Sequence, residues 1–278
     1  MDYLWSFLCI VLLFSSSTNC GVNGNVHGST IQTLKFTMAE LRALNTGQFV
    51  NSRPSDFDSF PDEVKRKKCR KGGVRRRNSK RGTRPILPSV ITGNVQSISN
   101  KMDELYASLR FRDFRNCSMM CFSETWLHDK IHDPVLNGFT LLRADRDKEI
   151  TKKSKGGGVC VYVNKEWCHP ANITVKQKVC TPHVELLCVA ARPYYLPREF
   201  SHVIVTVVYI PPQANEKEAT DTLFRLVSDQ QTASPDALFL VTGDFNRTSL
   251  KNKLPTFQQC VNVHTWKDKT IDLFYTNV

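Results

Sequence analysis

A series of short apolar runs is the feature that most constrains how this chain can fold. Each run is four to eight residues long and rich in Val, Ile and Leu, a pattern typical of buried strands. The runs lie at residues 89–95, 118–122, 139–142, 159–163, 185–191, 203–210, 237–241 and 271–275. Helical patterns are few: Asn100 is expected to cap one, and another spans about residues 216–230. Because many strands with few helices do not fit a regular alternation, the sequence predicts an α/β fold of two mostly antiparallel sheets with helices outside.

Polar residues recur where these runs end. Asn94 ends the first run, Glu124 follows the second, and Tyr209 lies near the end of the sixth. Asp244 and Asn246 follow the seventh run, in the sequence Gly-Asp-Phe-Asn. Strand ends are rigid, and they bring residues that are distant in the sequence to one edge of a sheet. Carboxylates gathered there can share Mg²⁺, which takes few protein oxygens and keeps places for water and phosphate.

Each of these residues also has a simpler explanation. Asn94 can be a turn residue, Glu124 an exposed strand end, and Tyr209 a packing residue before two prolines. Asp244 and Asn246, two apart after a continuous strand, are expected to point to the same side. The alternative for that pair is a turn closed by the Asp side chain. The ordered set is more specific than any of its members.

The ordered set leads to a family resemblance. The matching pieces are GNVQSISNKMDEL around Asn94, CFSETWL around Glu124, RADRDKEITKKSKGGGVCVYVN from Arg143, VVYIPP from Val207, GDFN from Gly243 and TIDLFYTN from Thr270. The block from Leu87 to Val278 resembles the endonuclease domain of LINE-type non-LTR retrotransposons. These domains belong to the endonuclease/exonuclease/phosphatase superfamily, and they are similar to apurinic/apyrimidinic endonucleases and, more distantly, to DNase I.

The resemblance implies a four-layer α/β/β/α sandwich of the DNase I-like type and nicking of DNA with Mg²⁺, with Mn²⁺ as the alternative ion. In the family pattern Glu124 binds the metal and Asn94 supports the metal and phosphate site. Tyr209 contacts the scissile phosphate. In the same pattern Asp244 orients or deprotonates the attacking water, and Asn246 positions that water. Asp272 orients a catalytic histidine. No small-molecule cofactor is implied.

Two departures from the family pattern bear on activity. The family ends with a Ser-Asp-His motif after the strand that matches TIDLFYTN, and this sequence ends at Val278, before such a motif. Gln96 stands where relatives often carry Arg. We therefore expect a domain that is incomplete at its C-terminus, with the family's fold but weak or absent nuclease activity.

A basic tract carries the whole net charge of +12. Residues 65–84 contain twelve Lys and Arg and no acid; removing these twelve from 38 leaves 26 basic residues against 26 acidic ones. The members that we assign to nucleic-acid binding are Lys65, Arg66, Lys67, Lys68, Arg75, Arg76 and Arg77. Such a run attracts polyanions without sequence specificity and in a salt-sensitive way. We favour nucleic-acid contact or nuclear targeting as the role of this tract, and a solvated linker is the alternative.

The N-terminal part divides into two segments. Residues 1–20 contain an apolar stretch followed by small residues, which resembles a secretory signal peptide and is too short for a comfortable membrane span. Residues 21–85 are expected to be largely disordered, and the nuclease-like domain then occupies residues 86–278.

Ten scattered cysteines without a CxxC pair predict free thiols, with Cys121, Cys160 and Cys188 in the core. We favour a nuclear or cytoplasmic location over secretion.

Three functions therefore remain open. The first is a magnesium-dependent DNA-nicking endonuclease of retrotransposon origin. The second is a non-catalytic remnant that binds nucleic acid mainly through residues 65–84. The third is a secreted DNase-like phosphodiesterase, which sequons such as that at Asn172 would favour and the sequon at Asn246, inside the predicted site, would oppose. The sequence leaves the oligomeric state undetermined.

Overall fold

Two six-stranded sheets form the part of the protein that the computed structural model describes. The described residues are 9–14 and 30–35, whose backbone alone is described, 87–153, and 155–278. All of them belong to one structural unit, which comprises residues 1–36 and 86–278. The basic tract at residues 65–84 and most of the signal-like segment lie outside the described residues. Within the described ranges, no helix combines the length and the apolar character that a membrane crossing requires.

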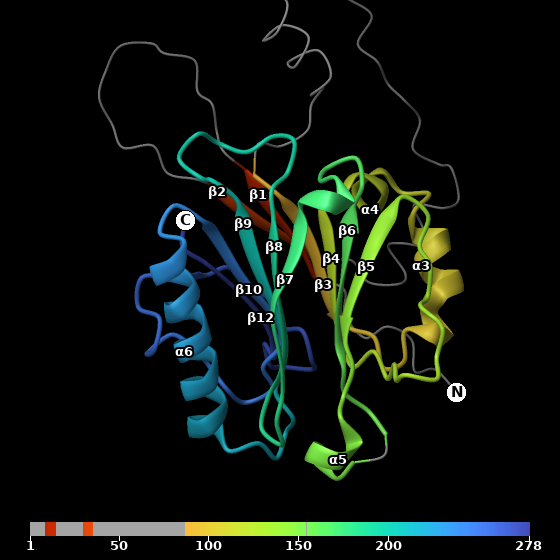
Figure 1. Ribbon diagram of the computed structural model, residues 1–278, viewed down its shortest axis with the longest axis vertical. Coiled ribbons are helices and arrows are strands. Elements are labelled where there is room, and N and C mark those ends of the chain that lie inside the picture. The colour runs from red at the N-terminus through yellow and green to blue at the C-terminus, as the bar shows by residue number, and fades with distance from the viewer. Residues whose placement is uncertain (1–8, 15–29, 36–86, 154) are drawn as a thin grey trace, which may run out of the picture. The chain divides into compact units, whose positions relative to one another are not determined.

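The two sheets lie face to face (Figure 1). The first has the order β2-β1-β3-β4-β6-β5, and the second has the order β11-β12-β10-β9-β8-β7. The strands of the first are β1 Cys9–Phe14, β2 Thr30–Lys35, β3 Ser89–Asn94, β4 Met119–Ser123, β5 Phe139–Ala144 and β6 Val159–Asn164. Those of the second are β7 Ile173–Cys180, β8 Glu185–Ala191, β9 Val203–Tyr209, β10 Leu238–Asp244, β11 Gln258–Gln259 and β12 Asp272–Thr276. Among these strands, β3 with β4 and β9 with β10 pair in parallel, and the other pairs are antiparallel, as predicted.

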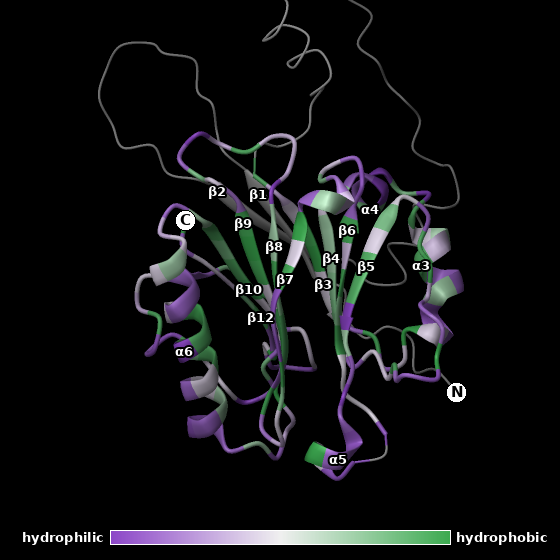
Figure 2. Ribbon diagram, in the orientation of Figure 1, coloured by the Kyte–Doolittle hydropathy of each residue, from purple (hydrophilic) through white to green (hydrophobic). Residues whose placement is uncertain are grey.

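Helices cover the outer faces of both sheets. The helices α3 Met102–Ser108 and α4 Arg112–Asn116 pack on the first sheet through Leu105 and Phe114. The longer helix, α6 Glu216–Ala233, packs on the second sheet through Leu223, Leu226 and Val227, the face that the sequence predicts. Figure 2 shows its apolar face turned to the sheet and its polar face turned outward. The short α5 Lys148–Thr151 and the 3₁₀ turn Pro170–Asn172 lie in loops.

The start of α3 differs from the sequence prediction. Asn100 was expected to cap this helix. Instead, a 3₁₀ turn over Ser99–Lys101 contains Asn100, and no side chain caps the helix that follows.

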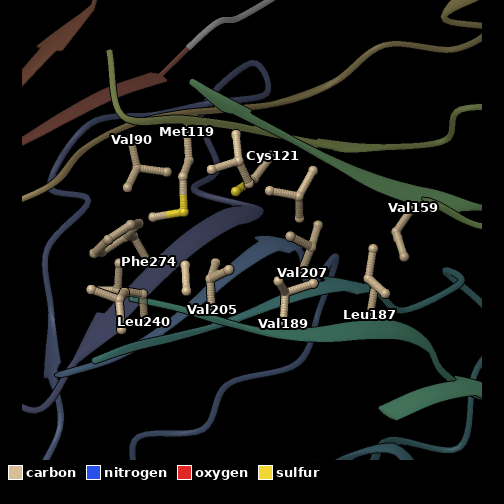
Figure 3. Close-up of a cluster of buried hydrophobic side chains, with 14 of the residues drawn as sticks. Val90, Met119, Cys121, Val159, Leu187, Val189, Val205, Val207, Leu240 and Phe274 are labelled. Carbon is tan, nitrogen blue, oxygen red and sulfur yellow. The ribbon is translucent and has the colours of Figure 1, made fainter. Parts of the chain in front are cut away.

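A continuous apolar layer joins the two sheets. Val90, Met119 and Cys121 of the first sheet face Val205, Leu240 and Phe274 of the second, and all six are fully buried (Figure 3). Burying an apolar side chain of this size stabilises a fold by about 1.5–3 kcal/mol, so this layer fixes the sheets against each other. With the helices outside, the order of layers is helix, sheet, sheet, helix, the α/β architecture that the sequence predicts. Cys121, Cys160 and Cys188 are buried in these sheets as small core residues, which confirms that prediction.

Four strands were not predicted, and the shortest of them is the two-residue β11. The strand β7 lies at the edge of the second sheet, and its central side chains are exposed and, except for Val175, polar. A bulge at Lys176 interrupts its pairing with β8. Because β7 buries few side chains, it lacks the apolar run on which the strand predictions depended. Lysines and a bulge are common on edge strands, where they prevent pairing with the strands of other molecules. The strands β1 and β2 were also unexpected; β1, within the signal-like segment, pairs antiparallel with β3. The signal-peptide assignment itself stays a prediction.

Candidate active site

The apolar layer between the sheets ends in a polar rim. Along β10, Leu240 lies in the layer, and the alternation of a strand places Thr242 and Asp244 on the same face. Along β3, Thr92 and Asn94 continue from the core in the same way. The hydroxyl of Thr242 donates to that of Thr92 at 3.0 Å, and the amide Nδ2 of Asn94 donates to Asp244 Oδ2 at 2.9 Å. Two residues that are 150 positions apart in sequence are therefore in direct contact across the sheets.

The position of Asp244 depends on the glycine before it. Gly243 has φ +140°, in the region that favours glycine, and a methyl group there would overlap the carbonyl oxygen of Val208. The absent side chain lets β10 pair closely with β9, with Asp244 opposite Tyr209. The glycine of the Gly-Asp-Phe-Asn sequence is thus a requirement of the sheet, and it brings two predicted site residues side by side.

Two buried carboxyls face each other at this rim. Asp244 and Asp272 are partners in the antiparallel pairing of β10 with β12, and their exposed fractions are 2% and 5%. Burial, followed by the effect of nearby negative charge, raises the pKa of both carboxyls. For Asp244, hydrogen bonds from Asn94 Nδ2 and from the backbone N–H of Asn246 oppose this rise in pKa.

Asp272 is poised to accept a further hydrogen bond. Its Oδ1 is buried and has no hydrogen-bond partner among the described residues. Its backbone N–H donates to Thr265 Oγ1 at 3.0 Å. An unpartnered buried oxygen is uncommon, because it loses solvation without compensation. The role predicted for Asp272, which is to orient a histidine, stays a prediction.

Glu124 reaches the same rim from the first sheet. It follows β4 with φ +57°, a left-handed conformation that turns the chain out of the strand. Its Oε2 accepts a hydrogen bond from Trp126 Nε1 at 2.6 Å. Burial, followed by the charge of Glu124, raises the pKa of Tyr209, so the phenol keeps its proton at neutral pH. The structure therefore brings together Glu124, Tyr209 and Asp244.

Asn246 lies at the site, although not for the predicted reason. The strand β10 ends at Asp244, and Asn246 has φ +51°, so the alternation of a strand does not extend to it. Its backbone N–H donates to Asp244 Oδ1 at 3.0 Å, which makes the turn closed by an Asp side chain that was the alternative explanation. Its Nδ2 donates to the carbonyl of Ile210 at 2.8 Å. The side-chain amide is held beside Asp244 by this turn.

Two charged residues that sequence reasoning missed support Tyr209. Arg146 and Glu185 form an ion pair whose side chains are 6% and 3% exposed. The guanidinium of Arg146 lies 5.6 Å from the centre of the Tyr209 ring. Glu185 Oε2 accepts the backbone N–H of Gly158 at 2.5 Å, and a methyl group on Gly157 would overlap the guanidinium. Arg146 and the glycines lie inside one family motif, but their partners are distant in sequence, so no role was assigned to them.

The site residues border one cavity of about 390 Å³. Five of the predicted residues line it: Asn94, Glu124, Tyr209, Asp244 and Asn246. Gln96 also lines it, at the position where relatives often carry Arg. Two cationic side chains that were not predicted, Arg247 and Lys269, complete the lining, together with apolar residues. The cavity thus combines uncompensated carboxylates with cations at its border.

The donor set fits one hard cation. In the described part of the chain, no Lys or Arg forms an ion pair with Glu124, Asp244 or Asp272. The same part of the chain contains no preformed group of three or more His, Cys, Asp or Glu ligands. Mg²⁺ is commonly held by one or two carboxylates with water and substrate phosphate, so the smaller set suits it. Glu124 with the amide oxygen of Asn94 would hold the ion.

Comparisons with known proteins concern the fold. No protein-family model and no curated protein sequence matches the chain. Similar solved structures include the endonuclease domain of TRAS1, a telomere-specific non-LTR retrotransposon, with 14% identity and a TM-score of 0.45 over 67% of this chain and 82% of that one. Humanized D. rerio TDP2 shows 12% identity and a TM-score of 0.44, with the same coverage.

A third similar structure is an endonuclease/exonuclease/phosphatase family protein from Bacteroides thetaiotaomicron, with 12% identity, a TM-score of 0.43, and coverage of 64% of this chain and 74% of that one.

Proposed function

We propose that the domain over residues 86–278 is a phosphodiesterase that nicks DNA with the help of a divalent cation, Mg²⁺ in the first place. The observation that carries this proposal is the contact between Asn94 and Asp244 across two sheets, in one cavity with Glu124 and Tyr209. A structural polar cluster would be expected to neutralise its carboxylates internally. Here, within the described residues, the acids remain without ion pairs and border a hollow.

The chain's own groups divide the chemistry between them. Asp244 is held by donors on both oxygens, and its raised pKa makes it a suitable acceptor for a proton of the attacking water. Asn246, fixed by Ile210, can position that water. Tyr209 keeps its proton and can donate to a phosphate oxygen. A cation held by Glu124 would neutralise charge on the phosphate in the transition state.

A plasmid-nicking assay on the full chain tests this proposal. With Mg²⁺ present, we expect Glu124→Gln and Asp244→Asn each to lower the nicking rate by on the order of 10²–10³-fold, because each removes a charge that acts on the transition state. A chelator should abolish nicking, and added Mg²⁺ should restore it. The control is Glu199→Gln, which removes an exposed carboxylate that lines no described cavity. Activity that survives both site substitutions would overturn the site assignment.

The same experiments discriminate the other two functions. A wild-type chain that binds DNA but does not nick it, and whose binding is lost when residues 65–84 are deleted, would be the non-catalytic remnant. The weak activity expected from the sequence is measured in the same assay. We further propose a nuclear or cytoplasmic location, motivated by the basic tract. Secretion from cultured cells with a glycan on Asn172 would instead favour the secreted phosphodiesterase.

A further inference from the structure

A second cavity, of about 230 Å³, lies next to the candidate active site. Its lining includes Trp126 and four cationic side chains, Arg146, Lys148, Lys153 and Lys155. The lysines come from the loop between β5 and β6, which belongs to a family motif that received no function above.

The two cavities meet at one hydrogen-bonded pair. Glu124 lines the first cavity, Trp126 lines the second, and Trp126 Nε1 donates to Glu124 Oε2 at 2.6 Å. Consecutive residues of one loop also divide between them, since Gln96 lines the first cavity and Ser97 the second. A chain molecule that occupies the first cavity can therefore continue directly into the second.

The second cavity carries an uncompensated positive charge. Its lining contains no Asp or Glu. The charge of Arg146 is neutralised by Glu185, whereas no carboxylate within the described ranges forms an ion pair with Lys148, Lys153 or Lys155. Three like charges in one hollow repel one another, and a polyanion relieves that repulsion. The ammonium of Lys155 lies 4.7 Å from the centre of the Trp126 ring, which leaves this cation at the cavity wall.

We propose that this basic cavity, lined by Lys148, Lys153, Lys155 and Trp126, binds the DNA strand next to the bond that is cleaved, and that it takes a flanking phosphodiester. The proposal deepens the proposed function and rests on it. Phosphate is the group that matches an acid-free hollow with three lysines, since most protein–DNA contacts that position the strand are made to phosphate oxygens. Because the two cavities meet at the hydrogen bond between Trp126 and Glu124, a strand whose scissile phosphate lies beside Glu124 can place a neighbouring phosphate in the basic cavity.

Binding measurements test the basic cavity apart from catalysis. The full chain carries Asp244→Asn to prevent cleavage, and the probe is a fluorescently labelled DNA duplex followed by anisotropy at several salt concentrations. The test variant adds Lys148→Gln, Lys153→Gln and Lys155→Gln. The control variant instead adds Lys165→Gln, Lys217→Gln and Lys251→Gln, three exposed lysines that line neither cavity. The basic tract at residues 65–84 is present in every protein, so its contribution is the same throughout.

We expect the test variant to bind DNA on the order of 10-fold more weakly than its parent at about 0.1 M salt. The slope of the logarithm of the binding constant against the logarithm of the salt concentration should fall by the amount that roughly two to three phosphate contacts contribute. The control variant should match the parent. Equal binding by the test and control variants would overturn the proposal. Failure of the proposed function looks different: a wild-type chain that does not nick plasmid refutes the phosphodiesterase, whatever the lysine variants do in binding.

Discussion

The charge pair of Arg146 and Glu185 shows how much of this site depends on single buried groups. Both side chains are almost fully buried, and burial raises the pKa of Glu185 against the opposing effects of Gly158 N–H and Arg146. The pair holds the glycine loop on one side and contacts Tyr209 on the other. Because a buried guanidinium cannot lose its proton, it requires its partner. Arg146 and Glu185 are therefore positioning residues rather than catalytic ones.

At the residue scale we predict that Glu185→Gln lowers the free energy of unfolding by about 3 kcal/mol, because it leaves Arg146 buried and unpaired. The amide oxygen of Gln can still accept from Gly158 N–H. Adding Arg146→Met removes the orphaned charge and should recover roughly half of the loss. Urea unfolding of the single and double variants measures both values. A double variant less stable than Glu185→Gln alone would contradict this account.

At the scale of elements, the strand β10 combines two requirements in seven residues. Its alternation sends Leu240, Thr242 and Asp244 toward the other sheet and Phe239 and Val241 toward α6. Its parallel pairing with β9 leaves no room for a side chain at Gly243. The edge strand β7 is the opposite case: it buries little and contributes no residue to the site cavity. The strand that carries Asp244 is thus one whose packing leaves no room for a side chain at Gly243.

For β10 we predict that Gly243→Ala destabilises the fold by about 2–3 kcal/mol or more, since the methyl group meets backbone and the conformation is strained for any L-residue. Gly138→Ala is the matched control. Gly138 also has a positive φ, +85°, but a methyl group there meets nothing within 4 Å, so about 1 kcal/mol is expected. Urea midpoints of the two variants give the comparison, and equal losses would exclude a steric role for Val208.

At the scale of the whole molecule, the site exists only because two sheets are held in one alignment. The apolar layer supplies the attraction between them, but apolar contacts are not directional. The hydrogen bond between Thr92 and Thr242 is directional, fully buried, and lies one pleat away from the contact between Asn94 and Asp244. It fixes which residues of β3 and β10 stand opposite each other.

We predict that Thr92→Val and Thr242→Val each destabilise the protein by about 1–2 kcal/mol, because each leaves a buried hydroxyl or carbonyl without its partner. The double substitution should cost at least about 0.5 kcal/mol less than the sum of the single losses, since it removes both hydroxyls. Urea denaturation of all four proteins provides this double-mutant cycle. Strictly additive losses would show that the two hydroxyls do not couple the sheets.

The sequence by itself determined the strands with strong apolar runs and the helix α6. It also determined that polar residues such as Asn94, Glu124 and Asp244 stand where several of these strands end. The strands and the helix follow from local periodicity, which every residue of a run repeats. Strand β7 escaped prediction because its exposed, lysine-rich pattern has no such signal. The sequence left the conformation at Asn246 open between a continued strand and a turn, because no glycine marks the left-handed residue that ends the alternation.

Only the tertiary structure decided which of those strand ends meet. Nothing local in the sequence connects Arg146 to Glu185 and Tyr209, or the lysines of the β5–β6 loop to Trp126, because these partners lie on different strands and loops. Their contacts arise from the registers of two sheets and from the packing between them. Pairing between distant strands exists only in the folded protein. It brings the separate strand ends together in the cavity that Glu124 and Asp244 line, next to the cavity that the lysines line.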